Sequence, residues 1–527
     1  MKKISLLIIA LATTFVVHAQ WTNDSVNNNH IANCASDAGE IYLSTDRKTG
    51  DTYVQWTEAG SNGYGPVLQR LTFDGTPQWG TDGIRITGQN FYSYSEGIAM
   101  TATSDNAVVS CFATASDQTV AVKIDSSGTY TWGAQGVALF NDNAFSRAEL
   151  VAGNDGGVWA LGFDYQRLYL QYINADGTLN PCITIDGGTY NVRYGKLTLG
   201  PDNSVFLTYE KVSSGFGLYA DKEIYVIGYS TNGTPMGPAV KLMSTQTFQV
   251  TYLHYAIPDG MGGGYAYIWH PGIGNAFNTY VFHYDDNGLS TIAGQDGIPV
   301  HSTDPSNYYV EAYGTVDPVS HDLIIGYEQT DAASQSQSRI YVNRITPSGT
   351  RLWGEGILVA DNIGVSYSNI LVDAFEDGSG FSVIYKKSSA NNSYISTVEA
   401  VGMDMNGNIL WTKTLNSIQY DRTVCRNTTG FNLGQNIVAW VNSTSGGLYA
   451  QNIFPDGTMG VVTTPPDDTG IEEWTNDVVV NILQVFNILG QPMNVKNLNE
   501  LNTGIYIIQG LTEDGRLVNK KVFIKQL

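Results

Sequence analysis

Short runs in which apolar and polar residues alternate fill most of the chain. Pairs of such runs, rich in Val, Ile, Tyr and Thr, flank turns of Asp, Asn, Gly and Pro, as in IYLSTDRKTGDTYVQWTEA and GKLTLGPDNSVFLTYEK. Alternation with a period of two around turn residues predicts β-hairpins. No long segment has helical periodicity, so we expect an all-β fold.

A second pattern follows each hairpin. It consists of a strand, a turn that ends in Gly, often a Trp-Gly pair, and a short fourth strand such as Ile84–Ile86. The turn glycines of the eight copies are Gly75, Gly128, Gly177, Gly233, Gly288, Gly349, Gly407 and Gly457. Their mean spacing of about 55 residues identifies a repeat whose copies differ mainly in loop length.

Four antiparallel strands in each repeat predict the blade of a β-propeller. Eight glycines and eight hairpins favour eight blades, and seven is the alternative if one copy is displaced. A two-sheet sandwich would not repeat the same hairpin order eight times. Closing the ring requires a strand from the far end of the chain, for which Val26–Ala32 and Met459–Thr463 are the candidates.

A tryptophan recurs four residues after the turn glycine in four copies. These residues are Trp79, Trp132, Trp353 and Trp411. Because Trp buries a large area, we interpret them as packing between adjacent blades. The alternative is that they stack on a ligand.

The repeats resemble the delta-sixty type of repeat found in secreted bacterial proteins. Units of that type carry a strand, an Asp-Gly turn, an aromatic-Gly pair and a Gly-Val pair. The segment VLQRLTFDGTPQWGTDGIRI has the first three features and Gly-Ile in the last place. The resemblance covers about residues 40–460. It implies an architecture and no particular activity.

Residues 1–19 have the pattern of a secretory signal peptide. Lys2 and Lys3 precede an apolar stretch from Ile4 to Val17, and Ala19 is a suitable cleavage site. The alternative, a membrane anchor, requires about 20 apolar residues. We therefore expect export, with no transmembrane segment after cleavage.

Export places the four cysteines where disulfides persist. They are Cys34, Cys111, Cys182 and Cys425, which allow three pairings that the sequence does not distinguish. The other interpretation is that they are buried, unpaired side chains in strands.

The composition changes after the last repeat. Residues 463–476, which contain Pro465 and Pro466, form a polar linker between a propeller over residues 20–462 and a C-terminal domain over residues 477–527. That domain has strand patterns at Val478–Ile488, Gly504–Gly510 and Leu517–Ile524. These patterns predict a small β-sandwich.

The C-terminal domain resembles the type A sorting domain of type IX secretion cargo in the Bacteroidetes. The residues that carry the resemblance are Leu489, Gly490 and Gln491, then Gly504 and Tyr506, then Lys520 and Lys521. The Asn-Pro pair with which that family usually begins is missing near Val478. The resemblance implies that the type IX machinery is a partner and that the protein is secreted or held on the outer cell surface.

The chain has 27 Lys and Arg residues against 49 Asp and Glu residues, a formal net charge of −22. This balance argues against nucleic-acid binding, which requires clustered cations. The histidines lack metal-ligand spacing, and neither a G-x-S-x-G motif nor a phosphate-binding loop is present. We interpret acidic turns such as Tyr284–Gly288 as turns rather than calcium sites. No catalytic residue, metal or cofactor is therefore expected.

These features favour a non-catalytic binding or adhesion protein that presents a loop face to a protein or glycan. The Tyr-rich segments Phe91–Ser95, Ser306–Tyr313 and Gly364–Asn369 would supply contact area, unless they only cap strand ends.

The alternative is a glycan-active hydrolase or lyase at the mouth of the propeller channel. A sialidase would need three converging arginines, for which Arg85, Arg147 and Arg193 are candidates. An enzyme predicts a cluster of titratable residues at the channel, and a binding protein predicts none.

Overall fold

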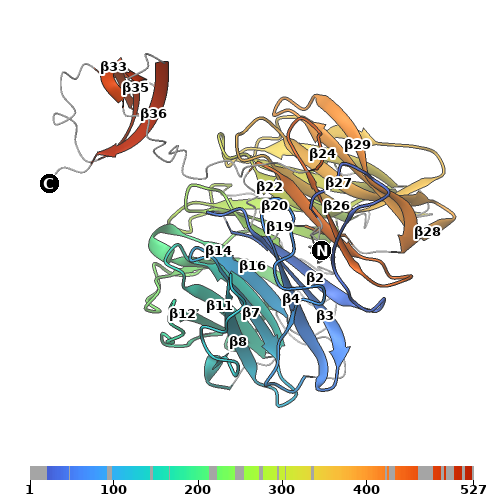
Figure 1. Ribbon diagram of the computed structural model, residues 1–527. Helices are drawn as coiled ribbons and strands as arrows, with labels where there is room; N and C mark the ends of the chain where they lie inside the picture. Colours follow the sequence, from blue (N-terminus) through green and yellow to red (C-terminus); the bar gives the residue numbers. More distant parts are fainter. Residues whose placement is uncertain are drawn as a thin grey trace, which may run out of the picture.

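A computed structural model of the 527-residue chain (Figure 1) describes residues 20–524 with several gaps. The gaps are residues 47, 92–97, 143–145, 165, 213–221, 244–254, 272–276, 293–295, 303, 305, 334–337, 422–423, 427–433, 461–478, 488–491, 494–503 and 513–516. The proposed signal peptide and linker lie outside the described residues.

The described residues form an all-β propeller of eight blades, which confirms the predicted fold. In Figure 1 the blades follow one another in sequence order from blue to orange. Blade 1 consists of β2 (Gly39–Thr45), β3 (Thr52–Gly60), β4 (Gly63–Leu71) and β5 (Ile84–Arg85), and blade 2 of β6 (Ala99–Thr103), β7 (Ala107–Ala113), β8 (Thr119–Asp125) and β9 (Val137–Ala138). Blade 3 consists of β10 (Ser146–Ala152), β11 (Val158–Asp164), β12 (Arg167–Ile173) and β13 (Ile183–Asp186), and blade 4 of β14 (Asn191–Leu199), β15 (Val205–Val212), β16 (Lys222–Tyr229) and β17 (Val240–Lys241).

The second half of the ring repeats this order. Blade 5 consists of β18 (Tyr255–Pro258), β19 (Gly264–Pro271), β20 (Phe277–Tyr284) and β21 (Ile298–Pro299), and blade 6 of β22 (Asn307–Val316), β23 (Leu323–Asp331), β24 (Ser338–Ile345) and β25 (Ile357–Ala360). Blade 7 consists of β26 (Val365–Ala374), β27 (Phe381–Ser389), β28 (Asn392–Met403) and β29 (Ile409–Asp421), and blade 8 of β30 (Val424–Arg426), β31 (Asn436–Val441), β32 (Leu448–Ile453) and β1 (Asn29–Ala32). One parallel pairing, Asn278 with Tyr309, joins blades 5 and 6 into an eight-stranded sheet.

Each blade is an antiparallel meander whose first strand is the innermost. First strands of successive blades contact each other around the ring, among them β2 with β6, β10 with β14, β14 with β18 and β18 with β22. In a propeller these strands surround the central channel.

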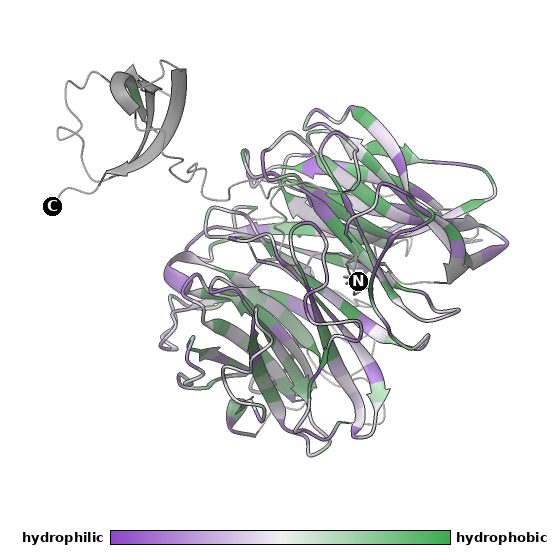
Figure 2. Cartoon of the chain, in the orientation of Figure 1, coloured by the Kyte–Doolittle hydropathy of each residue, from purple (hydrophilic) through white to green (hydrophobic). Residues whose placement is uncertain are grey.

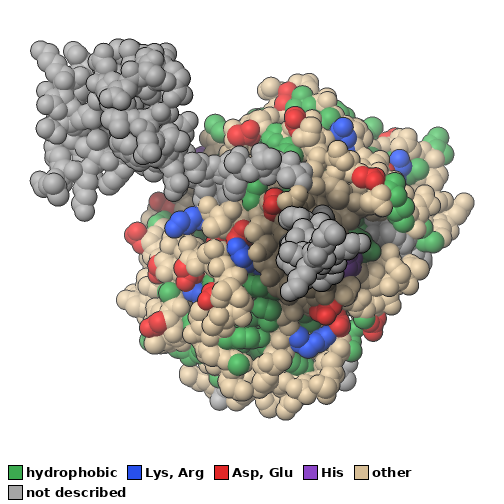
Figure 3. Space-filling model, viewed as in Figure 1, with side chains coloured by type: hydrophobic (Ala, Val, Ile, Leu, Met, Phe, Trp, Pro, Cys, Tyr) green, Lys and Arg blue, Asp and Glu red, His purple; other side chains and the backbone are tan. Residues whose placement is uncertain are grey.

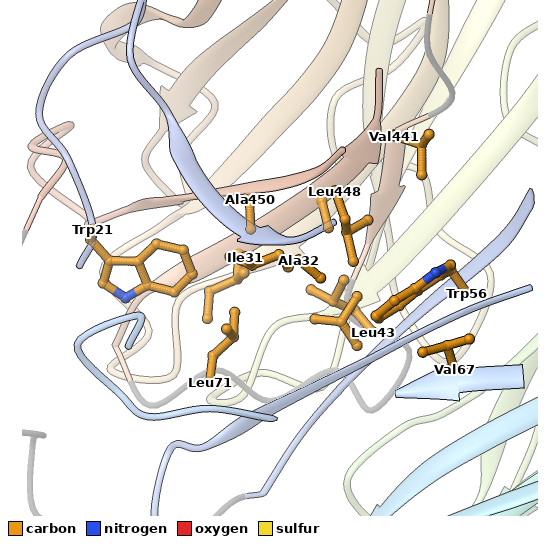
Figure 4. Close-up of a cluster of buried hydrophobic side chains, with 13 residues drawn as sticks. Trp21, Ile31, Ala32, Leu43, Trp56, Val67, Leu71, Val441, Leu448 and Ala450 are labelled. Atoms are coloured by element: carbon orange, nitrogen blue, oxygen red, sulfur yellow. The ribbon is translucent and has the colours of Figure 1, made fainter. Parts of the chain in front are cut away.

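The N-terminal segment closes the ring. Of the two candidate segments, the one near the N-terminus supplies the strand, because β1 pairs antiparallel with β32 as the outermost strand of blade 8. Figure 4 shows the apolar cluster at this junction, in which side chains of the N-terminal segment, blade 8 and blade 1 interdigitate. Its labelled members are Trp21, Ile31, Ala32, Leu43, Trp56, Val67, Leu71, Val441, Leu448 and Ala450.

The eight turn glycines adopt one conformation. Their φ values lie between 74° and 89°, in the left-handed region that only glycine enters without strain. In every copy the glycine amide donates a hydrogen bond to the carbonyl three residues earlier, as Gly75 does to Thr72 at 2.7 Å. This is a three-residue hairpin loop with the glycine in the bulge position.

Apolar side chains fill the spaces between blades. Figure 2 shows hydrophobic residues concentrated in the strands and polar residues in many of the connections. One cluster, for example, joins Leu161 and Leu170 of blade 3 to Leu197 and Leu207 of blade 4. Each blade therefore buries both faces against its neighbours, which explains why single copies of the repeat would not be stable alone.

A basic or hydroxyl-bearing side chain five residues before the turn glycine is paired with an aspartate in five blades. The aspartate comes from the turn between the first and second strands of the same blade. These cross-turn pairs are Arg70–Asp51, Lys123–Asp105, Tyr172–Asp155, His283–Asp259 and Arg344 with Asp317 and Asp322. They connect the turn between the first two strands to the turn that follows the third strand, and both turns lie at the same end of the blade.

The C-terminal residues form a separate sheet, which Figure 1 shows apart from the ring. It is antiparallel, in the order β34 (Pro492–Met493), β33 (Val479–Asn487), β35 (Gly504–Thr512) and β36 (Leu517–Ile524). It is the one sheet of this domain within the described residues. Gly504 and Tyr506 lie on β35, Lys520 and Lys521 lie on β36, and residues 489–491 lie outside the described part of the chain.

A search of the described residues for a helix with the length and apolarity needed to cross a membrane found none.

Candidate functional site

One register position on the innermost strands changes character around the ring. The position is defined by strand pairing. The residue seven before the turn glycine lies on the third strand and pairs with a residue of the second strand. The partner of that second-strand residue on the first strand occupies the position. Its occupants in blades 1 to 8 are Tyr42, Ala99, Glu149, Lys196, Tyr255, Tyr313, Leu371 and Cys425. The four consecutive residues Glu149, Lys196, Tyr255 and Tyr313 are charged or phenolic, and we call them the inner arc.

Side chains of the inner arc contact one another from blade to blade. Lys196 Nζ forms an ion pair with Glu149 Oε1 of blade 3 and lies 5.9 Å from the ring centroid of Tyr255 of blade 5. The Tyr255 ring lies 5.6 Å from that of Tyr313 in blade 6 and stacks on Tyr267 at 5.5 Å. The Lys196 and Glu149 side chains are 21% and 32% exposed, so the arc is accessible at the channel wall.

A β-bulge directs two cations of β14 to the same face. Residues three apart on a regular strand point to opposite faces. Arg193 nevertheless pairs with Glu210 and Lys196 pairs with Thr208, two residues apart on β15, because the ladder shifts between them at Tyr194. Tyr194 has a φ of 52°, which a bulge accommodates. Both cations therefore lie on the face turned toward blade 5.

Arg193, Glu210 and Lys222 form a buried triad on that face. Lys222 lies diagonally from Glu210, since Glu210 pairs with Ile224 two residues along β16. Ile224 and Phe206 of this face pack against Ala266 and Phe282 of blade 5, which fixes its direction. The triad residues are only 6%, 1% and 2% exposed.

Burial changes the proton affinity of Lys222. It lowers the pKa of Lys222 from the ordinary value, Glu210 acts in the opposite direction, and Arg193 lowers the pKa further. Buried ionisable groups with shifted pKa values and specific charged neighbours are typical of functional sites.

Blade 5 faces the triad with a histidine and a tyrosine. His270 continues the alternation of Ala266 and Ile268, whose side chains pack on blade 4. Its ring lies 5.3 Å from that of Tyr280, which is half-buried against the same cluster. Between blades 4 and 5 the described residues thus combine cations, a carboxylate, an imidazole and a phenol, which are groups that bind anions and transfer protons.

The predicted tryptophans lie between blades. The indole N–H groups of Trp79, Trp132 and Trp411 donate to Ser126, Ala175 and Pro455, at 3.3, 3.0 and 2.7 Å. In each case the acceptor is two residues before the turn glycine of the next blade. Trp353 instead stacks on Phe381 of the next blade, with centroids 6.0 Å apart. These contacts hold the repeat glycines and tryptophans in the framework, away from the inner arc.

Trp21 supplies the corresponding contact at the end of the ring. Its N–H donates to the Phe73 carbonyl at 2.8 Å, again two residues before a turn glycine. Trp21 lies outside the repeat, so the periodic pattern in the sequence does not reveal it.

The three candidate arginines are not gathered by the fold. Arg85, on the outermost strand of blade 1, forms an ion pair with Glu58 at 2.8 Å. Arg193 lies in the buried triad of blade 4, and the Arg147 side chain is outside the described part of the structure. The two described arginines belong to different sites, so they do not form a sialidase carboxylate clamp.

His283 lies between a threonine and an aspartate, in the order of groups found in a catalytic triad. Its Nδ1 lies 2.8 Å from Thr291 Oγ1 and its Nε2 lies 3.0 Å from Asp259 Oδ2. The threonine hydroxyl, however, donates to the Pro347 carbonyl at 2.5 Å. His283 also occupies the cross-turn position that Arg70 and Lys123 hold in other blades, so we assign it to the framework.

The three cysteines whose side chains the structure describes are not reactive groups of the site. Cys34, Cys111 and Cys182 are unpaired, and burial raises the pKa of Cys111 to about 12 and those of Cys34 and Cys182 to about 11. The Cys425 side chain lies outside the described part. Within the ranges that the structure describes, no three His, Cys, Asp or Glu side chains come together as metal ligands.

Two of the three Tyr-rich segments are strands rather than loops. Asn307–Val316 is β22 and Val365–Ala374 is β26, and Tyr309 and Tyr367 are each 1% exposed. Most of Phe91–Ser95 lies outside the described residues. Tyr313 belongs to the inner arc, and no periodic signal in the sequence distinguishes it from its buried neighbours.

No family model and no curated protein matches this chain. Solved structures do resemble it. A puromycin hydrolase mutant in complex with PGG matches at 12% identity and a TM-score of 0.44, over 80% of this chain and 61% of that protein. A polysaccharide lyase described as an ulvan lyase, bound to -[GlcA(1-4)Rha3S]-, matches at 11% identity and a TM-score of 0.44, over 75% and 98%. Prolyl oligopeptidase B from Galerina marginata matches at 10% identity and a TM-score of 0.41, over 91% and 55%.

These similarities concern the fold, and the chain spans about three fifths of the puromycin hydrolase. The proteins are nevertheless hydrolases and a lyase, and the inner arc places titratable groups at the channel wall. The expectation of a non-catalytic binding or adhesion protein is therefore wrong. It assumed that no such cluster would be present, because the sequence does not reveal which strand positions meet at the channel.

Proposed function

We propose that this protein is a glycan-active enzyme, a hydrolase or lyase, that acts at the mouth of the propeller channel on blades 3 to 6. The observation that supports this proposal is the inner arc. The same register position is occupied by Ala99 in blade 2 and Leu371 in blade 7, so the framework does not require charge there. Charged side chains occur at this position only in blades 3 and 4, and phenols follow in blades 5 and 6; the one further phenol at the position is Tyr42 in blade 1.

The composition of the inner arc suits a sugar chain. Aromatic rings such as Tyr255 and Tyr313 offer flat amphipathic surfaces, and Lys196 and Glu149 offer groups for hydrogen bonds and proton transfer. The buried triad behind Lys196 adds fixed charges in a region from which water is excluded, where they act strongly on a bound group.

The test is depolymerisation of a panel of acidic and neutral polysaccharides by the chain from residue 20 onward. New reducing ends report hydrolysis or elimination, and ultraviolet absorbance of an unsaturated product reports elimination alone. We expect cleavage of at least one polysaccharide, and a loss of about 100-fold or more in kcat/KM for Tyr255→Phe.

Tyr42→Phe is the matched control, since Tyr42 holds the same register position in blade 1. It should leave the rate unchanged. Absence of cleavage across the panel, or equal rates for the two variants, would contradict the proposed activity.

We also propose that the protein is exported through a signal peptide and the type IX machinery, with residues 477–527 as the sorting domain. The β-sheet of β33 to β36, which contains Gly504, Tyr506, Lys520 and Lys521, is compatible with that role. Truncation after residue 462 should retain the protein in the periplasm of a type IX-competent bacterium. Its appearance in the medium would refute the sorting role.

A further inference from the structure

Three cations and two carboxylates meet on and beside one face of blade 4. Arg193, Lys196 and Lys222 are the cations, and Glu210 and Glu149 are the carboxylates. The chain as a whole carries a formal charge of −22, so a local excess of positive charge is unusual here. Figure 3 shows charged side chains of both signs scattered over the visible surface rather than collected by sign.

We propose that this face binds the carboxylate of a uronic acid unit, and that the protein cleaves an anionic polysaccharide next to that unit by β-elimination. The inference rests on the proposed function and specifies its substrate class and its reaction.

Lys196 is the cation that a sugar in the channel would reach. Its side chain is 21% exposed, whereas the triad residues behind it are nearly inaccessible. An ammonium group has three N–H donors, so the ion pair with Glu149 leaves donors for a second carboxylate. The ring of Tyr255 on the other side limits where that carboxylate can sit.

Elimination fits the available groups better than hydrolysis does. Glycoside hydrolysis uses two carboxyl groups across the scissile bond. Among the described inner-arc side chains, Glu149 is the only carboxylate, and it is occupied by Lys196. Phenols and cations, by contrast, are the groups that elimination from a uronate requires.

The step balances without any co-reactant. A base takes the proton from C5 of the uronate, and the electron pair of that C–H bond forms the C4–C5 double bond. The C4–O bond to the neighbouring sugar breaks, and its oxygen leaves with the bonding pair and receives a proton. A cation on the carboxylate stabilises the charge that develops at C5. The rings of Tyr255 and Tyr313 lie at this wall. The phenolate form of one of them takes the C5 proton, and the phenol so formed gives that proton to the leaving oxygen.

The test compares polyuronates with the same polymers after chemical reduction of their carboxylates to alcohols. The enzyme should release an ultraviolet-absorbing unsaturated product from at least one polyuronate and cleave the reduced polymer about 100-fold more slowly or not at all. Lys196→Gln should raise KM for the polyuronate about 10-fold or more. Uronate oligosaccharide binding, measured by calorimetry, should weaken in parallel.

Lys211→Gln is the matched control. It removes the same charge from the same blade, but Lys211 lies over Tyr225, whose side chain packs toward blade 3. It should leave both KM and binding unchanged.

The outcomes separate the two proposals. Cleavage of neutral or reduced polymers at the same rate, or products without the double bond, overturns the inference and leaves a glycan-active enzyme. Failure to cleave any polymer overturns the proposed function. In that case uronate binding that is insensitive to Lys196→Gln also overturns the carboxylate site.

Discussion

The inner arc of blades 3 to 6 and the closing junction of blades 8 and 1 contrast within one repeating framework. At the junction Trp21, Trp56 and Leu448 are at most 2% exposed and belong to one buried apolar cluster. In the inner arc the side chains are partly exposed, charged or phenolic, and they contact one another from blade to blade. The difference teaches that stability and chemistry are assigned to different parts of the ring.

The largest effect should come from the junction. Trp21→Ala removes a side chain that is 2% exposed and its 2.8 Å hydrogen bond to Phe73. We expect a loss of about 3–5 kcal/mol in the free energy of unfolding, measured by urea titration. Trp353→Ala, at a half-buried interblade position, should cost less. An equal or smaller loss at Trp21 would show that the ring does not depend on this closure.

Next in size is the contrast between two ion pairs. The Arg344 side chain is 14% exposed, bonds Asp317 and Asp322, and donates to Met405 of the next blade at 2.6 Å. Arg344→Gln should destabilise by about 3 kcal/mol, because two buried carboxylates lose their partner. Lys196→Gln should cost about 1 kcal/mol or less, since its pair is partly exposed. Thermal unfolding of both variants measures the two losses of stability. Similar losses would contradict the assignment of Arg344 to the framework and of Lys196 to the inner arc.

A smaller effect distinguishes two glycines with nearly the same backbone conformation. Gly177 has a φ of 87°, and a Cβ atom there would lie 2.8 Å from Trp132. Gly133 has a φ of 77° but open space around its Cβ position. Gly133→Ala should cost about 1 kcal/mol from backbone strain alone, and Gly177→Ala about 1–2 kcal/mol more, from contact with the indole. Equal costs in chemical denaturation would mean that the interblade contact is not tight.

The smallest effect concerns acid. Burial acts to raise the pKa of Asp259, but hydrogen bonds from His283 and from the Met261 and Gly263 amides outweigh it and lower the pKa below 3.8. A lowered folded-state pKa gives stability that is present above about pH 4 and is lost as the pH falls through the folded value. Stability measured from pH 5 to pH 2 should therefore fall, and Asp259→Asn should make that fall shallower. An unchanged slope would show that Asp259 does not contribute.

The framework was predictable because its requirements recur. Gly75 and its seven counterparts need a left-handed backbone in every copy, so glycine appears at a regular spacing. The sequence pattern also predicted a strand at Leu517–Ile524, and β36 has these bounds. Closure by the N-terminal segment was one of two alternatives, since both ends of the chain have suitable short apolar runs.

The inner arc was not predictable, because its residues share a position and not a residue type. Glu149, Lys196 and Tyr255 have no common pattern along the chain, and only the strand register aligns them. The bulge at Tyr194 makes the problem harder, since it turns an odd spacing between Arg193 and Lys196 into a shared face. The segment Ser306–Tyr313 resembled a loop because a bulge between Val310 and Tyr313 breaks the alternation of period two.

The position of β1 also determines when the molecule can become complete. Its partner β32 begins at Leu448, more than four hundred residues later in the chain. During synthesis, blade 8 cannot be finished until nearly the whole propeller has been made. Blade 1 therefore lacks its neighbour on one side until that point. Until β32 has been made, the chain therefore lacks the antiparallel pairing of β1 and the buried contacts of the closing junction.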